Sequence, residues 1–276
     1  MKFDSADAAQ ISEIINDVAR MEIMPRFNGT IANAAREKTS GFDIVTDADE
    51  AAEQQLSKWL LSAFPGALII GEEATARDPA LLDQIEHAEL AFIIDPIDGT
   101  KNFASGLPLF GVMVAATVRG RVAFGAIHDP VCGDTVLAIR GEGAWRHHEG
   151  REPVRLHVAP PVPVDQMQGV AGTNFLPEPL RTTVTRNLAR CGLNFWMRCA
   201  AQEYRLAASG HCHFLVYNKL MPWDHAAGWL VHQEAGGWSA HFDGEPYLPY
   251  HLAGGLVCAP DRASGMALCE ALFSDS

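Results

Sequence analysis

Two aspartates lie three residues apart in Asp95-Pro96-Ile97-Asp98-Gly99-Thr100, directly after the apolar run Leu90–Ile94. Ligands of α/β proteins usually bind beyond the carboxyl ends of strands, so we expect both carboxylates at such an edge. We expect Pro96 to end the strand, because proline lacks the N–H of a strand pair. Gly99-Thr100 can begin a helix whose free N–H groups face the same space. The segment therefore favours a divalent cation bridged to a phosphate, and an Asp-Gly turn is the simpler alternative.

Three further acids stand at the ends of predicted elements. Glu72, in Gly71-Glu72-Glu73, follows the predicted strand Ala67–Ile70. Asp224 lies at the start of a predicted helix, where the alternative is a helix N-cap. Asp49 lies in the first turn of another helix, where a negative charge suits the helix dipole. Each acid alone has a structural explanation, whereas together they can form one carboxylate site.

The order of the predicted elements indicates a mixed α/β or α+β fold. Apolar periodicity predicts helices at 6–24, 47–64, 178–189, 224–235 and 263–273. Strands are predicted at 67–70, 90–94, 169–172, 214–217 and 256–259, with three more between Leu109 and Ile139. Prolines at 160, 161 and 163 are the predicted crossing between two lobes. We therefore predict an N-terminal α+β lobe, 1–150, with most metal ligands, and a C-terminal α/β lobe, 151–276.

The composition limits the classes of partner that the protein can bind. The 276 residues carry a formal net charge of -13, which argues against nucleic acid or an anionic membrane as the main partner. The N-terminus lacks the basic and apolar regions of a signal peptide. Six cysteines without a C-x-x-C pair favour reduced thiols. We expect a small-molecule substrate and a cytoplasmic location.

Taken together, the ordered segments resemble the inositol monophosphatase family of lithium-sensitive, magnesium-dependent phosphatases. The matching blocks are Asp43–Asp49, Gly71-Glu72-Glu73, Asp95–Thr100 continuing to Pro108, Phe124-Gly125, Gly141–Ala144 and Trp223–Gly228 continuing to Gly237. They follow the family's order over nearly the whole chain. The resemblance implies the sugar-phosphatase fold, a layered α-β-α-β-α sandwich, and a homodimer.

The resemblance also implies a set of site residues for two to three Mg²⁺ ions. Glu72, Asp95 and the Ile97 carbonyl would hold the first ion. Asp95, Asp98 and Asp224 would hold the second, and a weaker third would lean on Glu72. Thr100 with Asp49 would orient the attacking water and take its proton. Gly99 and Thr100 N–H groups, beside Asp98, would cradle the phosphate, and Lys38 would lie on a loop that closes over it.

Substrate contacts are where the chain departs from the family pattern. Relatives that act on inositol phosphate usually place a glutamate where this chain has Tyr217. The usual Gly-Ser or Gly-Thr pair is replaced by Arg198-Cys199. Because a guanidinium pairs bidentately with phosphate or carboxylate, Arg198 makes a bisphosphate or an acidic sugar phosphate a candidate substrate. A structural ion pair is the alternative for Arg198, and space filling is the alternative for Tyr217. His225 is left open between contacting the leaving group and capping the helix.

The predicted function is hydrolysis of a small polyol or sugar phosphate by a magnesium-dependent phosphomonoesterase. Fructose-1,6-bisphosphatase, 3'(2'),5'-bisphosphate nucleotidase and histidinol phosphatase are alternatives within this class. The alternative from another class is a regulatory or adaptor protein that keeps the fold. A scaffold without catalytic demand has no physical reason to bring unpaired carboxylates together, because their repulsion costs stability.

Overall fold

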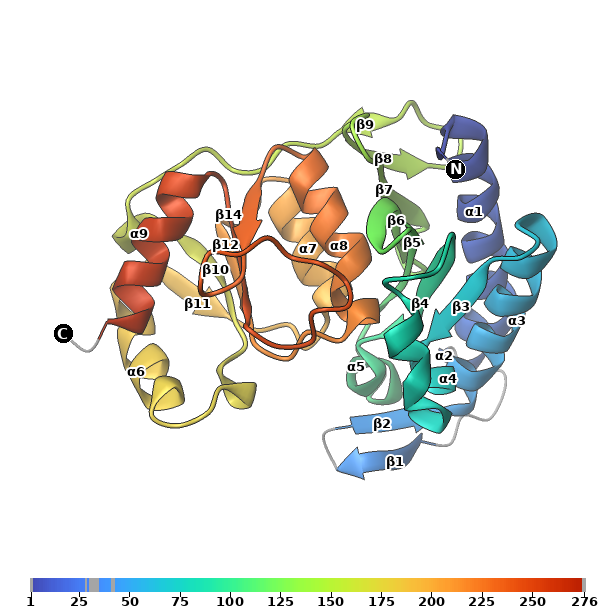
Figure 1. Ribbon diagram of the computed structural model, residues 1–276, viewed down its shortest axis with the longest axis horizontal. Helices are drawn as coiled ribbons and strands as arrows, with labels where there is room; N and C mark the ends of the chain where they lie inside the picture. Colours follow the sequence, from blue (N-terminus) through green and yellow to red (C-terminus); the bar gives the residue numbers. More distant parts are fainter. Residues whose placement is uncertain (1, 28, 30–34, 41–42, 275–276) are drawn as a thin grey trace.

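The computed structural model describes residues 2–27, 29, 35–40 and 43–274. Two sheets and three sets of helices alternate along the long axis of the molecule (Figure 1). From one end to the other, the layers are α1 with α3, a seven-stranded sheet, α7 with α8, a five-stranded sheet, and α6 with α9. The predicted α-β-α-β-α sandwich is confirmed.

The helices of the described residues are α1 (Ser5–Val18), α2 (Met24–Phe27), α3 (Asp47–Ala63), α4 (Glu72–Arg77), α5 (Thr100–Ala104), α6 (Leu180–Asn187), α7 (Ala200–Ala208), α8 (Pro222–Glu234) and α9 (Arg262–Phe273). Four of them, α3, α6, α8 and α9, begin and end within two residues of their predicted bounds, whereas α4 and α7 were not predicted. A π-helical turn at Ala19–Ile23 joins α1 to α2. The Thr46 side chain and Asp49 form a capping box that begins α3. The same acid that was predicted for chemistry therefore also fixes the start of its helix.

The seven-stranded sheet has the order β3-β4-β5-β6-β7-β8-β9 and is antiparallel except for the pair β3–β4. Its strands are β3 (Leu68–Gly71), β4 (Ala91–Asp98), β5 (Gly111–Val118), β6 (Arg121–Asp129), β7 (Asp134–Ile139), β8 (Ala144–His148) and β9 (Val154–Arg155). The mixed five-stranded sheet has the order β11-β10-β12-β14-β13. Its strands are β10 (Gln168–Ala171), β11 (Leu193–Phe195), β12 (Phe214–Tyr217), β13 (Trp238–Ala240) and β14 (Leu256–Ala259). A separate hairpin joins β1 (Ala35–Ser40) and β2 (Asp43–Thr46).

The expectation that Pro96 ends its strand is wrong. Strand β4 continues through Pro96 to Asp98, and its pairing with β5 shifts register between Asp95 and Asp98. A bulge leaves a residue outside the hydrogen-bonded ladder, which is where a proline without an N–H is tolerated. The irregularity places both aspartates at the end of one strand.

The two larger sheets are joined through the layer of α7 and α8, and glycines allow the close approach of these elements. A Cβ at Gly125 on β6 would lie 2.7 Å from the Ala227 carbonyl oxygen of α8. Within α8, a Cβ at Gly228 would lie 2.1 Å from the Tyr204 ring of α7. One buried cluster joins apolar residues of both sheets across this layer, including Met113 and Leu215. The helix that carries Asp224 is therefore packed tightly against the sheet that carries Asp95.

The chain passes between the sheets in the segment that contains the three prolines. Strand β9 still pairs with β8 of the first sheet, and β10 begins the second sheet at Gln168. The division at residue 150 stays a prediction. The six cysteines are unpaired. Among the described residues, no helix is both long enough and apolar enough to span a bilayer.

Candidate active site

Three carboxylates from segments far apart in the sequence converge at one point. Asp95 and Asp98 lie on β4, and Asp224 lies in the first turn of α8. One potential ligand atom from each lies within 4.8 Å of those of the other two. Across residues 2–27, 29, 35–40 and 43–274, no other His, Cys, Asp or Glu side chains form such a group of three. The structure thus brings together three of the acids that the sequence analysis singled out.

The turn after β4 is built to hold Asp98 in place. Gly99 has a φ of 84°, in the left-handed region, and caps α5. A Cβ there would lie 2.9 Å from the Leu109 carbonyl oxygen, so both conformation and space require glycine. The Asp98 carboxylate accepts hydrogen bonds from the Ala201 N–H and the Cys199 thiol, the latter at 3.0 Å. Residues at the start of α7 therefore fix an acid at the end of β4.

The carboxyl groups of the cluster are difficult to ionise because they lie close together and are buried. Burial raises the pKa of Asp95 well above its usual range, and the negative charges of Glu72, Asp98 and Asp224 raise it further. Burial likewise raises the pKa of Asp98 to about 6, although the hydrogen bond from Ala201 counteracts this. A bound cation would reverse this penalty. The donors are all oxygens, so the residues present fit Mg²⁺ and do not resemble a thiolate or imidazole site for zinc.

Asp49 and Thr100 lie beside one another although they are 51 positions apart in the chain. The Thr100 hydroxyl is 3.4 Å from Asp49 Oδ1 and 3.0 Å from the Ile97 carbonyl oxygen. The other carboxylate oxygen of Asp49 accepts hydrogen bonds from the Thr46 N–H and hydroxyl. Burial raises the pKa of Asp49 to about 7, with a contribution from the charge of Glu72. Only one oxygen of Asp49 therefore faces Thr100.

Glu72 is the first residue of α4, and a buried glutamate that the sequence analysis missed fixes this helix. Glu53 is 3% exposed and accepts hydrogen bonds from the Glu73 and Ala74 N–H groups at 2.7 and 2.8 Å. A Cβ at Gly71 would lie 2.3 Å from the Glu53 carboxyl carbon, so a side chain there would displace the Glu53 carboxylate. Helical spacing from Asp49 to Glu53 and Leu56 could have revealed an acid on the buried face of α3.

A cavity of about 650 Å³ surrounds the three aspartates. It is lined by Glu72, Asp95, Ile97, Asp98, Gly99, Thr100, Asp224, Arg198 and Tyr217, all of which the sequence analysis predicted, and by Arg181, Lys219, Phe175, Trp196 and others that it did not. Asp49 lies behind Thr100 and does not line the cavity. Lys38 belongs to β1, not to a loop, and its side chain lies outside the described part of the molecule.

Tyr217 and His225 are engaged with protein groups. The Tyr217 hydroxyl donates a hydrogen bond to Glu203 Oε2 at 2.8 Å. Both ring nitrogens of His225 have partners, the Tyr204 hydroxyl at 3.1 Å and the Lys219 carbonyl at 2.9 Å. Burial lowers the pKa of His225 to about 4, so its ring is neutral at pH 7. His225 thus supports the cavity wall through these two contacts.

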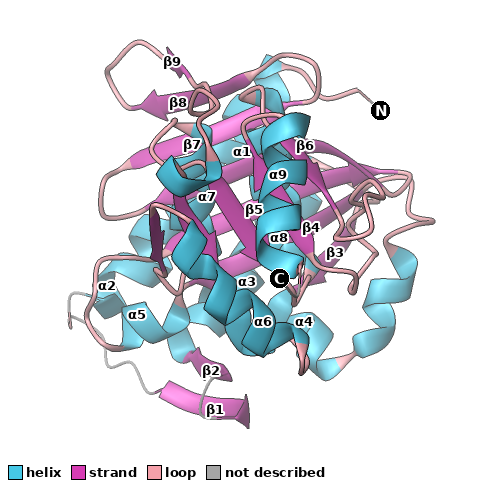
Figure 2. Ribbon diagram, turned by 90° about the vertical axis from the view of Figure 1, so that its left-hand side faces the viewer, coloured by secondary structure: helices cyan, strands magenta, loops and turns pink. Residues whose placement is uncertain are grey.

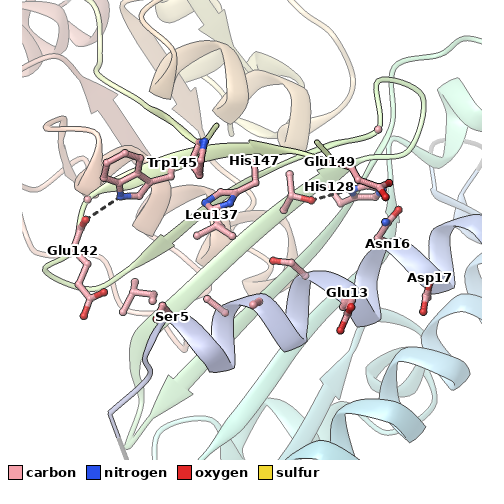
Figure 3. Close-up of a pocket in the computed structure, with 18 of the residues that line it drawn as sticks. Ser5, Glu13, Asn16, Asp17, His128, Leu137, Glu142, Trp145, His147 and Glu149 are labelled. Atoms are coloured by element: carbon pink, nitrogen blue, oxygen red, sulfur yellow. Dashed lines mark hydrogen bonds between the residues drawn. The ribbon is translucent and has the colours of Figure 1, made fainter. Parts of the chain in front are cut away.

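A larger cavity, about 1070 Å³, lies between α1 and strands β6–β8 (Figure 3). Glu13 and Asp17 of α1 and Glu149 beyond β8 contribute to its lining. Among the residues that the structure describes, its acids do not meet as a group of three. Its size alone therefore does not make it the reaction site.

The stacked sheets and the carboxylate cluster between them define a layered α/β protein with a candidate divalent-cation site. The chain belongs to the inositol monophosphatase family, whose model matches residues 2–274. It is 31% identical over 230 residues to "Nus factor SuhB" of Pasteurella multocida, covering 80% of this chain and 79% of the relative. It is 32% identical over 217 residues to "Fructose-1,6-bisphosphatase/inositol-1-monophosphatase" of Thermotoga maritima, covering 76% of each. The crystal structure of suhB from Bartonella henselae matches with a TM-score of 0.84 at 24% identity, over 99% of this chain and 100% of that one, and shows the same fold.

Proposed function

We propose that the protein is a Mg²⁺-dependent phosphomonoesterase that hydrolyses a small phosphate ester in the 650 Å³ cavity. The observation that carries this proposal is the convergence of Asp95, Asp98 and Asp224 within 4.8 Å. Membership of a phosphatase family supports it. A polyol or sugar phosphate is the starting candidate, and the bisphosphate and histidinol phosphate alternatives remain to be separated by assay.

The roles of the acids follow from their positions. Asp95, Asp98 and Asp224 would hold Mg²⁺, with Glu72 and the Ile97 carbonyl as further ligands for a total of two to three ions. Ions bound there supply positive charge for the phosphate and lower the pKa of coordinated water. Gly99 has a backbone that no side chain obstructs, so the segment Gly99-Thr100 can approach the phosphate closely.

Thr100 and Asp49 would orient the attacking water and accept its proton. The Thr100 hydroxyl can accept from that water while it donates to Asp49 Oδ1, 3.4 Å away. The Thr46 contacts hold the carboxylate of Asp49 so that Oδ1 alone is available. The proton therefore has a short route from the cavity to a buried carboxylate.

Phosphate release measured with and without Mg²⁺ tests the proposal. Hydrolysis that requires Mg²⁺ and is lost on chelation supports it. A protein that releases no phosphate from polyol phosphates, sugar phosphates, bisphosphates or histidinol phosphate overturns it. Millimolar lithium is expected to inhibit, and scattering coupled to size-exclusion chromatography is expected to show a homodimer. The six unpaired thiols support action in the reducing cytoplasm.

A second candidate function is binding of a protein partner. The name "Nus factor SuhB" of a relative at 31% identity favours this alternative. The net charge of -13 disfavours direct RNA contact. A variant without hydrolytic activity separates the two functions, because a partner role would survive the loss of catalysis.

A further inference from the structure

Three cations line the cavity and have no acidic partner among the residues that the structure describes. Arg181 comes from α6, Arg198 from the turn before α7, and Lys219 from the segment after β12. All three side chains are exposed. None of them forms an ion pair with a carboxylate of the described residues. The chain has 34 acidic and only 21 basic residues. A cavity lined by three cations without an acidic partner among the described residues therefore differs in charge from the chain as a whole. We call these three residues the cationic rim.

Arg198 occupies its position in a costly backbone conformation. Its φ is 56°, in the left-handed region, and the other described non-glycine residue with positive φ is Arg119. Glycine would adopt this φ without penalty. Arginine at this position costs stability and adds a long cationic side chain to the cavity wall. The Arg198 side chain therefore lines the cavity at a cost in backbone energy.

Two large aromatic side chains line the same cavity and remain in contact with solvent. Phe175 is 55% exposed and Trp196 is 50% exposed. The Lys219 ammonium lies 5.8 Å from the centre of the Phe175 ring. The Asn218 side chain donates a hydrogen bond to the Phe175 carbonyl and steadies its backbone. Exposed rings beside cations are suited to stacking a flat ring that is attached to an anionic group.

We propose that the cationic rim is a subsite for a second phosphate of the substrate, and that Phe175 or Trp196 stacks on an aromatic base. The substrate class is a nucleoside bisphosphate. This proposal rests on the proposed phosphatase function: one phosphate is cleaved at the aspartates while the other stays bound at the rim. Water adds its oxygen to phosphorus, the ester P–O bond breaks, and the leaving hydroxyl receives the proton. The products are inorganic phosphate and a nucleoside monophosphate.

The same charges discriminate among the alternative substrates. An inositol monophosphate offers neither a second anion nor a flat ring. Histidinol phosphate carries an ammonium group, which the rim repels. Fructose 1,6-bisphosphate has the second phosphate without the ring, so it should rank between a nucleoside bisphosphate and a sugar monophosphate.

Steady-state kinetics on matched substrates test the proposal. The panel is an adenosine 3',5'-bisphosphate, adenosine 3'-monophosphate, fructose 1,6-bisphosphate and a sugar monophosphate, each with Mg²⁺. We expect kcat/KM for the nucleoside bisphosphate to exceed that for the monophosphate by about tenfold or more, as a charge-assisted contact gives. The excess should decline as ionic strength rises, because the rim is exposed.

Substitution of residues in the cationic rim distinguishes a role in binding the second phosphate from a role in stabilising the fold. Arg198→Gly should reduce the preference for bisphosphate over monophosphate by about tenfold, mainly through KM. It relieves the left-handed arginine and is expected to fold. Arg119→Gly is the matched control, because Arg119 has a φ of 49° in the turn between β5 and β6 and pairs with Glu89. Lys219→Met provides a second variant that leaves the backbone conformation unchanged.

The outcomes distinguish this proposal from the proposed function. Equal kcat/KM for bisphosphates and monophosphates, with Arg198→Gly affecting both alike, would overturn the subsite and leave the phosphatase intact. Preference for fructose 1,6-bisphosphate over the nucleotide would overturn the stacking base. Absence of hydrolysis for every substrate would instead remove the proposed function itself.

Discussion

The inner and outer ends of the cavity are built in different ways. The inner end consists of acids on a strand end and in the first turns of helices, and Asp95 is only 2% exposed. The outer end consists of exposed cations and aromatics on turns and on a short helix. Backbone groups hold the inner acids, as the Ala201 N–H holds Asp98. The rim cations have no such partners among the described residues.

Under the proposed function, this difference separates the groups for chemistry from the groups for substrate selection. Groups that hold ions must keep fixed positions, and regular elements joined by a tight layer of α7 and α8 provide them. Groups that select a substrate can vary on loops without disturbing the core. Figure 2 shows the seven-stranded sheet behind α7 and α8. Substitutions at the inner end should therefore have larger effects than those elsewhere.

The largest effect is expected for Asp95→Asn. Loss of the central carboxylate should lower kcat/KM by at least about 1000-fold, roughly 4 kcal/mol, because every neighbouring acid shares the cation with it. The free energy of unfolding without Mg²⁺ should stay the same or rise, since the repulsion among Glu72, Asp98 and Asp224 is relieved. Phosphate release and urea unfolding measure the two quantities.

An exposed acid provides the control for this prediction. Asp83→Asn, in the 3₁₀ turn Pro79–Gln84, should change neither quantity. If Asp95→Asn hydrolyses esters like the parent protein, the inner end is not the reaction site and the comparison fails.

The next effect concerns the pH dependence of stability, through the buried Glu203 below the rim. Burial raises the pKa of Glu203 to about 7 from its usual 4.5. As pH rises from 4.5 to 7, the unfolded chain releases this proton while the folded protein retains it. Stability is therefore lost across this window, by about 3 kcal/mol for this group, and is fully present below it. Glu203→Gln should remove this part of the loss.

Urea unfolding of parent and variant at pH 4.5 and pH 8 tests the sign. The difference isolates Glu203 from the other buried acids, which remain in both proteins. Glu270→Gln, exposed on α9, is the control. A variant that is as pH-dependent as the parent would show that Glu203 ionises at its ordinary pKa.

The sequence predicted the inner end far better than the outer end. Apolar periodicity predicts strands and helices from the sequence alone. An acid that directly follows such an element lies at its end, whatever the arrangement of the sheets. The predicted strand Phe214–Tyr217 and the helix that carries Asp224 were confirmed. Pro96 was misjudged because a bulge, which depends on the neighbouring strand, permits proline within a strand.

The outer end depends on contacts between segments far apart in sequence. The pairing of Tyr217 with Glu203 and the gathering of Arg181 with Lys219 arise only when α6, α7 and β12 pack together. The left-handed backbone of Arg198 has no signature in its own residue type. The family pattern, with glycine at that position, was the one available indication. The sequence therefore predicted the cluster of Asp95, Asp98 and Asp224 and named Arg198 and Tyr217, whereas the place of Arg181 and Lys219 in the cavity lining needed coordinates.

A smaller effect is expected for Glu53→Gln, which tests whether the inner end depends on support behind it. Glutamine offers one acceptor where Glu53 accepts from both the Glu73 and Ala74 N–H groups. The start of α4 should shift with Glu72, and the Mg²⁺ concentration for half-maximal activity should rise about tenfold, roughly 1.4 kcal/mol. A purely structural role would lower stability and leave the Mg²⁺ dependence unchanged. Glu86→Gln, exposed before β4, is the control.

The smallest effect is expected at Cys199, where the two ends of the cavity join. Its thiol donates to Asp98 Oδ2 at 3.0 Å, and the Ala201 N–H donates to the same oxygen. Cys199→Ser keeps a donor of similar size, so kcat/KM should stay within about twofold. Cys199→Ala removes the donor and leaves one of two contacts, so kcat/KM should fall about threefold to fivefold, under 1 kcal/mol.

Kinetics on one monophosphate and one bisphosphate should show equal losses for both, because the thiol acts on the inner acid. A loss confined to the bisphosphate would show that Cys199 acts on the cationic rim and not on Asp98.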